Sequence, residues 1–138
     1  MYNQSESQMT LYDYAQPFEG KLDESNRWVQ LAHAIPWQEL EQEYSAGFGK
    51  AGHKAFSVRI AFGSLVIRQA MGLSDRQTVQ LIRENPYLQY FIGMTQFSHE
   101  APFSAHSMVG FRQRFALEQV EQAVSLWKKF SRQNLSQG

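Results

Sequence analysis

Apolar residues recur along this chain with the spacing of amphipathic helices, and no run alternates apolar and polar residues long enough to form a sheet. Asn26 is suited to cap a first helix, and Pro36 is suited to begin a second. Each helix has apolar residues on one face: Trp28, Leu31 and Ile35 in the first, and Trp37, Leu40 and Tyr44 in the second. We therefore expect two short helices near the start of the fold.

The longest apolar stretch begins at Ser57 and ends at Gly72, and it predicts a buried central helix. Ser74 and Gln77 then have the S-x-x-Q spacing of a capping box, which predicts a helix from Asp75 with Val79 and Ile82 turned inward. Pro86 cannot continue that helix but suits the first position of another, which is capped by Asn85 and ended by Gly93.

Two further helices are expected in the last third of the chain. Ser104 is suited to cap the first, whose apolar stripe is Met108, Phe111 and Phe115. The second has Leu117, Val120, Val124 and Trp127 on one face. The fold class is accordingly all-α, a bundle of about six or seven short helices. Residues 1–22 lack periodicity and are expected to be a flexible arm that docks an aromatic side chain or two, and residues 23–135 form a single helical domain.

The composition indicates the cellular compartment in which the protein is expected to fold. Of the 138 residues 43% are hydrophobic, so the chain is expected to fold, and none is cysteine, which is typical of a reducing compartment. The start resembles no secretion signal, and no apolar run reaches the length of a membrane span. A soluble, cytoplasmic protein without membrane contact is expected.

Charge is unevenly distributed although the net charge is zero. Residues 1–49 contain two basic and eight acidic side chains, a net charge of −6, whereas residues 50–138 contain eleven basic and five acidic side chains, a net charge of +6. The second part is the candidate surface for a phosphate backbone. Such a split also occurs in proteins that touch no nucleic acid.

Known catalytic and metal-binding patterns are missing from the sequence. The four histidines have no metal-ligand spacing, the carboxylates form no pair in an apolar context, and no G-x-S-x-G motif occurs. The glycine-rich segment 46–56 lacks the Gly-Lys-Ser/Thr ending of a phosphate-binding loop. We therefore expect neither an enzyme nor a bound metal or cofactor.

The succession of a capped helix, a tight junction and further helices is typical of helix-turn-helix DNA-binding proteins, in which the first turns of one helix enter the major groove. Residues 104–114 are the expected groove-facing helix. Arg112 and Arg114 point about 200° apart around a helix, so one is expected to reach DNA while the other packs or pairs. The alternative is that Ser104 only caps the helix and both arginines face solvent. The candidate DNA-binding residues are Ser104, His106, Ser107, Arg112 and Arg114, with Arg76, Gln77, Lys50 and Lys54 as backbone or flanking contacts.

The phrases RENPYLQYFIG (83–93) and PFSAHSMVGFRQRF (102–115), with the upstream IPW at 35–37, resemble the N-terminal domain of DDE-type insertion-sequence transposases of the InsH-like group. The resemblance covers residues 25 to 116. It implies binding to the element's terminal inverted repeats, next to a catalytic domain that uses acidic residues and two divalent metals. Because the sequence stops at Gly138, where that domain would begin, we expect DNA binding without chemistry.

Double-stranded DNA at transposon ends is thus the expected partner, together with a second copy of the chain or a full-length transposase. The rival interpretation is a dimerisation module, suggested by the aromatic content and favoured if Tyr87, Tyr90 or Trp127 is exposed. Light scattering over a concentration range separates the two roles.

Overall fold

The computed structural model describes residues 17–46 and 56–137, and in these ranges the chain forms helices and no strand, as the all-α class predicts. The elements are η1 (Pro17–Gly20), α2 (Arg27–Ala34), α3 (Trp37–Ala46), α4 (Val58–Met71), α5 (Asp75–Glu84), α6 (Pro86–Phe91), α7 (Ser107–Arg112) and α8 (Leu117–Gln137). None of the described helices is long and apolar enough to cross a membrane.

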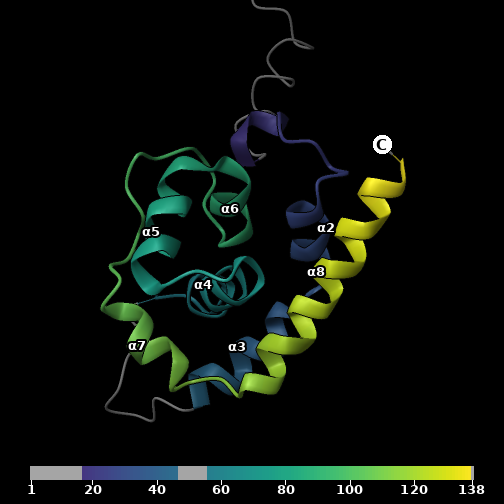
Figure 1. The fold of residues 1–138 in the computed structure, drawn as a ribbon. Helices are drawn as coiled ribbons and strands as arrows, with labels where there is room; N and C mark the ends of the chain where they lie inside the picture. Colours follow the sequence, from purple (N-terminus) through teal and green to yellow (C-terminus); the bar gives the residue numbers. More distant parts are fainter. Residues whose placement is uncertain (1–16, 47–55, 138) are drawn as a thin grey trace, which may run out of the picture.

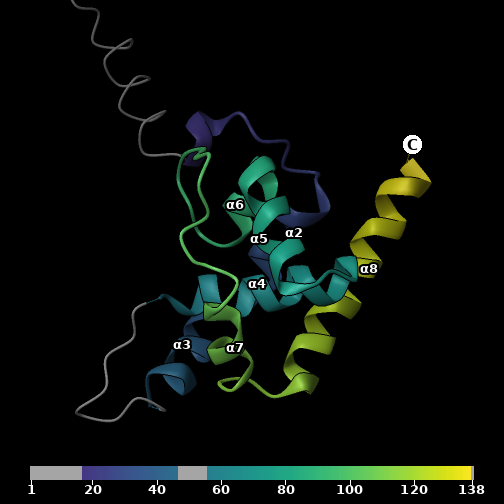
Figure 2. The ribbon, with the colours of Figure 1, turned by 60° about the vertical axis from the view of Figure 1, so that its left-hand side comes forward.

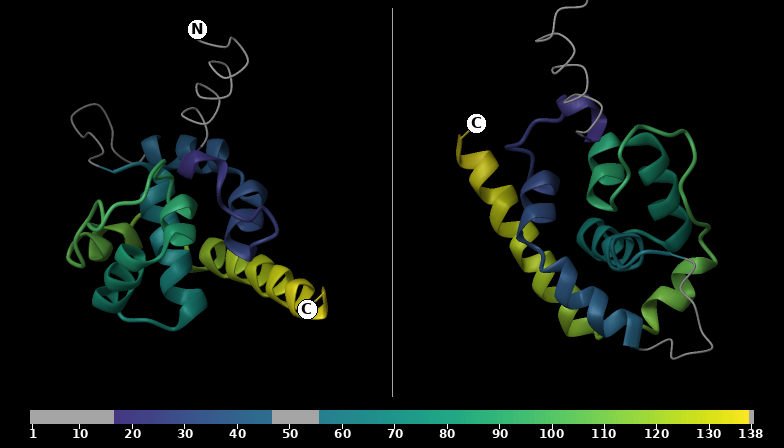
Figure 3. Two further views of the ribbon diagram at one scale, coloured as in Figure 1. Left: turned by 90° about the horizontal axis from the view of Figure 1, so that it is seen from above. Right: turned by 180° about the vertical axis from the view of Figure 1, so that it is seen from behind.

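Helix α4 is the centre of the bundle. Figure 1 looks almost along its axis, with α8 on one side, α5 and α7 on the other, and α6 and α3 above and below. Figure 2 shows α4 from its side, and Figure 3 again has α5 and α8 on opposite sides of it. The reason is its sequence: seven consecutive residues, 61–67, are buried, so the helix needs neighbours around most of its circumference.

The ends of the helices follow the capping signals in the sequence. The Asn26 side chain accepts a hydrogen bond from the Trp28 backbone N–H at 2.8 Å. Ser74 and Gln77 form the complete capping box, in which each side chain accepts from the other residue's backbone N–H, at 3.1 and 2.9 Å. Gly72 ends α4 in the left-handed region at φ 65°, which glycine adopts without steric cost.

Aromatic side chains bring α2, α3, α6 and α8 together. The rings of Trp28 and Trp37 lie edge-on to Phe91, with centroids 5.2 and 5.7 Å apart. The ring of Trp28 also contacts that of Trp127 of α8, with the two centroids 5.4 Å apart. Phe91 of α6 has no solvent exposure. Its contacts with Trp28 and Trp37 connect α6, which follows α4 in the chain, to α2 and α3, which precede it.

One expectation about an inward-facing residue was wrong. Leu117 is 63% exposed, because it is the first residue of α8 and lies at the rim of the bundle, so Val120 is the first residue of this face to be buried. In α5, Ile82 is fully buried and the half-buried Val79 packs against the core, as expected, and Thr78 is fully buried as well. The Thr78 hydroxyl donates to the Ser74 carbonyl at 2.8 Å, which makes burial of this polar side chain possible.

Residues 17–22 belong to the predicted arm, yet they contact the bundle. The Phe18 backbone N–H donates to the Thr95 carbonyl at 2.7 Å, and the Phe18 ring meets Tyr90 of α6 edge-on. Residues 1–16 lie outside the described residues, as do Lys50 and Lys54, so the boundary at residue 22 stays a prediction.

Candidate nucleic-acid interface

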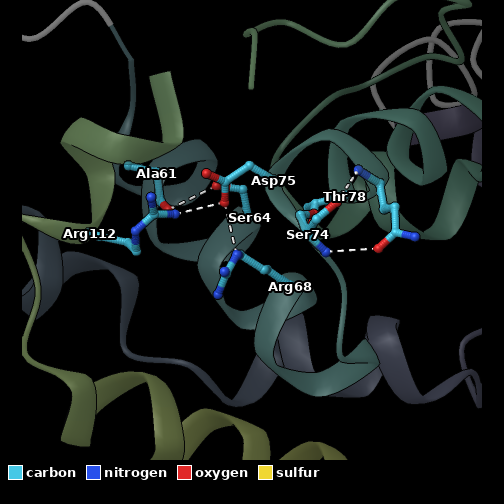
Figure 4. Close-up of polar contacts among 8 residues, drawn as sticks. Ala61, Ser64, Arg68, Ser74, Asp75, Thr78 and Arg112 are labelled. Atoms are coloured by element: carbon cyan, nitrogen blue, oxygen red, sulfur yellow. Dashed lines mark hydrogen bonds and ion pairs between the residues drawn. The ribbon is translucent and has the colours of Figure 1, made fainter. Parts of the chain in front are cut away.

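Three helices meet at the first residue of α5. The Asp75 carboxylate accepts a hydrogen bond from Arg112 Nη1 of α7 at 2.7 Å, and the Arg68 Nε of α4 lies 2.8 Å from the same oxygen (Figure 4). The local sequence places Asp75 there, because Gly72 ends α4 one turn after Arg68 and the capping box starts α5 at once. Arg112 lies 37 residues after Asp75 in the sequence.

The charges of this cluster do not cancel. One carboxylate faces two guanidinium groups, which leaves one net positive charge on side chains that remain partly exposed, 34% for Arg68 and 40% for Arg112. Burial alone raises the Asp75 pKa, but the hydrogen bond and charge of Arg112, together with Arg68, outweigh it, so the pKa lies below the usual value of 3.8. The junction can therefore hold Asp75 ionised and still attract an anion.

Asp75→Asn is expected to lower the free energy of unfolding at neutral pH, and the difference from the parent is expected to shrink as the pH falls. A carboxyl whose pKa is depressed by folding contributes stability above its unfolded pKa of 3.8 and loses this contribution below it. Urea unfolding of both proteins between about pH 7 and about pH 3 measures the effect. A difference that stays constant over this range would contradict the ion pair.

The two arginines of the 104–114 segment point to different neighbours. Arg112 reaches Asp75, whereas the charge of Arg114 acts on Tyr44 of α3, where it partly offsets the raising effect of burial on the tyrosine pKa. Both arginine side chains are exposed. The predicted divergence of the pair agrees with these contacts, and whether either residue contacts DNA stays a prediction.

The structure contradicts the expectation that Ser104 caps the helix. Helix α7 begins at Ser107, its N-cap is His106, and no side chain caps it. The preceding turn is closed by i→i+3 backbone bonds, from the Ser107 N–H to the Ser104 carbonyl at 3.1 Å, so the Ser104 hydroxyl is left 3.4 Å from that of Ser107. Ser104 and His106 are exposed and Ser107 is half-buried.

Arg76 and Gln77 lie exposed in the first turn of α5, next to the cluster. Gln77 uses its side-chain oxygen in the capping box. Sequence reasoning missed Arg68 and Asp75, because the pairing depends on the turn that reverses the chain between them. It also missed Gln80 and Arg83, which share the outer face of α5 and could have been found as polar residues opposite Thr78 and Ile82. Within the described residues, no group of three or more histidine, aspartate or glutamate side chains is placed to hold a metal ion.

Comparisons with known proteins give one family. Residues 16–114 match the family model described as Transposase domain (DUF772). A protein of Rhizobium meliloti, described as "Uncharacterized protein ORF8 in nfe locus", is 33% identical over 96 residues, which covers 70% of this chain and 46% of that protein. The chain thus spans about half the length of this relative. No solved structure matches.

Proposed function

Because the chain belongs to the Transposase domain (DUF772) family, we propose that it is the DNA-binding domain of an insertion-sequence transposase and recognises the element's terminal inverted repeats. Within the family, the phrases at 83–93 and 102–115 favour the DDE-type, InsH-like group. The role assigned to this chain is binding, without strand cleavage or transfer.

The observation that carries the proposal is the pairing of two arginines with one carboxylate at the start of α5. Arg68 and Arg112 both contact Asp75 and remain partly exposed, and the surface around these two side chains is the assigned face. Guanidinium groups bind phosphate oxygens with directed hydrogen bonds, and an arginine has five N–H donors, so Arg112 keeps donors for a phosphate while it contacts Asp75.

Further backbone contacts are assigned to the residues around this face. Ser104, His106 and Ser107 precede or begin α7, and their hydroxyl and ring groups suit contacts to phosphate and sugar. Gln77 in the first turn of α5 and Arg114 after α7 are further proposed contacts, as are Lys50 and Lys54, which lie outside the described residues. Such contacts position the protein on the duplex and make its affinity dependent on salt.

Arg112→Ala is expected to weaken binding to a labelled inverted-repeat duplex and to a scrambled duplex by a similar factor, because a phosphate contact is lost in both. The slope of log affinity against log salt should fall by about one. Binding of both duplexes at two or more salt concentrations measures this. The parent protein should also bind the inverted repeat more tightly than the scrambled duplex.

Arg132→Ala is the matched control, since Arg132 is exposed on α8, a helix that lies across the bundle from α5 (Figure 1), and should leave the salt slope unchanged. If Arg112→Ala and Arg132→Ala had equal effects on binding, the assignment of this face as the DNA-contacting surface would be wrong. If the parent bound neither duplex, DNA binding itself would be refuted.

Dimerisation is the alternative role that the sequence suggests, and the exposed leucines of α8 do not supply a surface for it. Leu117 and Leu126 are 63% and 37% exposed, but nine residues apart they lie about 180° from each other around the helix, and single exposed apolar side chains are ordinary on a protein surface. The aromatic residues that suggested this role do not supply the surface, because Trp127 is buried and Tyr87 and Tyr90 are half-buried.

A further inference from the structure

Helix α5 presents one packed and one open face. Thr78 and Ile82 have no exposure and face the bundle, where α5 packs against α4 and α6. The opposite face consists of exposed polar side chains: Arg76, Gln77, Gln80, Arg83 and Glu84. In Figure 1 this helix lies at the edge of the bundle away from α8. These side chains are exposed, and the segment between α6 and α7 runs beside the helix, where Arg83 contacts the His99 carbonyl (Figure 1).

Three of these side chains form a narrow stripe. Arg76, Gln80 and Arg83 have the spacing i, i+4, i+7, which places them within about 60° of arc and along about 10 Å of helix. Since base pairs in B-DNA are stacked about 3.4 Å apart, the stripe matches about three base pairs. Arginine pairs with the O6 and N7 of guanine and glutamine with the N6 and N7 of adenine, so the stripe has the donors and acceptors that recognise purines.

The connection to α4 suits insertion into a groove. Only Gly72, Leu73 and Ser74 separate the two helices, and Gly72 provides the left-handed residue of a tight turn, as in helix-turn-helix motifs. The two axes cross, with α4 seen end-on and α5 across the view in Figure 1. Helix α4 is held by the core, so it can support α5 rigidly against DNA.

Existing contacts leave the stripe able to bind. Gln80 Nε2 donates to the Glu84 carboxylate at 2.6 Å, and Arg83 Nε donates to the His99 carbonyl at 3.1 Å, both at the exposed surface. Each side chain keeps other donors, because an amide has two N–H groups and a guanidinium five. The acid at the start of the helix, Asp75, is already paired with two arginines and so repels phosphate less.

We propose that α5, and not the 104–114 segment, is the helix that enters the major groove, with Arg76, Gln80 and Arg83 contacting purine bases at the element's ends. This inference rests on the proposed DNA-binding function. The residues of α7 then contact the backbone beside the groove, because Arg112 is held at the first turn of α5.

The test is selection of bound sequences from a library of duplexes with a randomised core, using the full chain and three variants. The parent should enrich a motif that contains guanine and adenine. Gln80→Ala should lose about tenfold or more of the preference at one base pair. Arg76→Ala should lose preference at a different pair, so the result does not depend on the folding of one variant.

Gln113→Ala is the matched control, since Gln113 is an exposed glutamine in the rival segment and its loss should leave the motif unchanged. A motif altered by Gln113→Ala but not by Gln80→Ala would overturn the assignment of α5. So would salt-dependent binding that enriches no motif, although DNA binding would then stand. A parent protein that binds no duplex would overturn the proposed function as well.

Discussion

Gln89→Leu is expected to lower the free energy of unfolding by about 3 kcal/mol, although leucine has nearly the same size and is more apolar. Gln89 is fully buried on α6 and makes three hydrogen bonds. Its amide N–H groups donate to the carbonyls of Ile82, at 2.9 Å, and Ser98, at 2.7 Å, and its oxygen accepts from the Ser98 N–H at 2.9 Å. Leucine leaves these backbone groups without the partner.

The contact with Ile82 explains why α5 and α6 can follow each other so closely. In a continuous helix the Ile82 carbonyl would accept from residue 86, but Pro86 has no N–H. The Asn85 N–H reaches this carbonyl only at 3.4 Å, and Gln89 provides the shorter bond. The side chain therefore replaces the hydrogen bond that proline removes and at the same time fastens residue 98 to α6.

Urea unfolding measures this prediction, and Gln96→Leu is the control because Gln96 is exposed. The control should change stability by no more than about 0.5 kcal/mol. If Gln89→Leu were as stable as the parent, the three hydrogen bonds would contribute nothing that apolar burial cannot replace.

Phe91→Ala is expected to lower the free energy of unfolding by about 4 kcal/mol, the largest effect of any substitution considered, because a fully buried aromatic ring is replaced by a cavity. The site cannot collapse easily. Trp28 and Trp37 contact the ring from two helices, and Gly63 of α4 packs closely beside it. The protein is expected to unfold at a much lower urea concentration than the parent.

Tryptophan fluorescence in the folded variant gives a second readout, since both indole rings lose a neighbour. Phe97→Ala is the control: Phe97 is 42% exposed and its ring contacts only His99 among the described ring pairs, so the loss should stay below about 1 kcal/mol. Equal losses for the two phenylalanines would contradict the central position of Phe91.

The sequence by itself predicted the parts of the fold that depend on neighbours in the chain. The caps at Asn26 and Ser74 and the stop at Gly72 were all confirmed, because each depends on a side chain or glycine within three residues of the backbone group that it satisfies. The apolar spacing also predicted that α4 is buried and that the class is all-α.

Ser104 shows where this local reasoning ends. It has the chemistry of a cap, but Phe103 is buried against Phe56 and Phe111, and the turn that follows is closed by i→i+3 bonds. The regular helix therefore starts three residues later, at Ser107. The packing of Phe103 therefore determined the backbone conformation at Ser104, because a serine is compatible with a helix cap and also with a turn.

The candidate site was decided mainly by the tertiary structure. Residues 104–114 and 76–77 were selected from the sequence by residue type, yet their relation depends on Arg112 meeting Asp75 across 37 residues. Likewise, Gln89 could be recognised as essential only after its partners at Ile82 and Ser98 were known. Local periodicity and capping specify where helices form, because their partners are near in the chain, whereas the packing of α4, α5 and α7 specifies which charged groups share one surface.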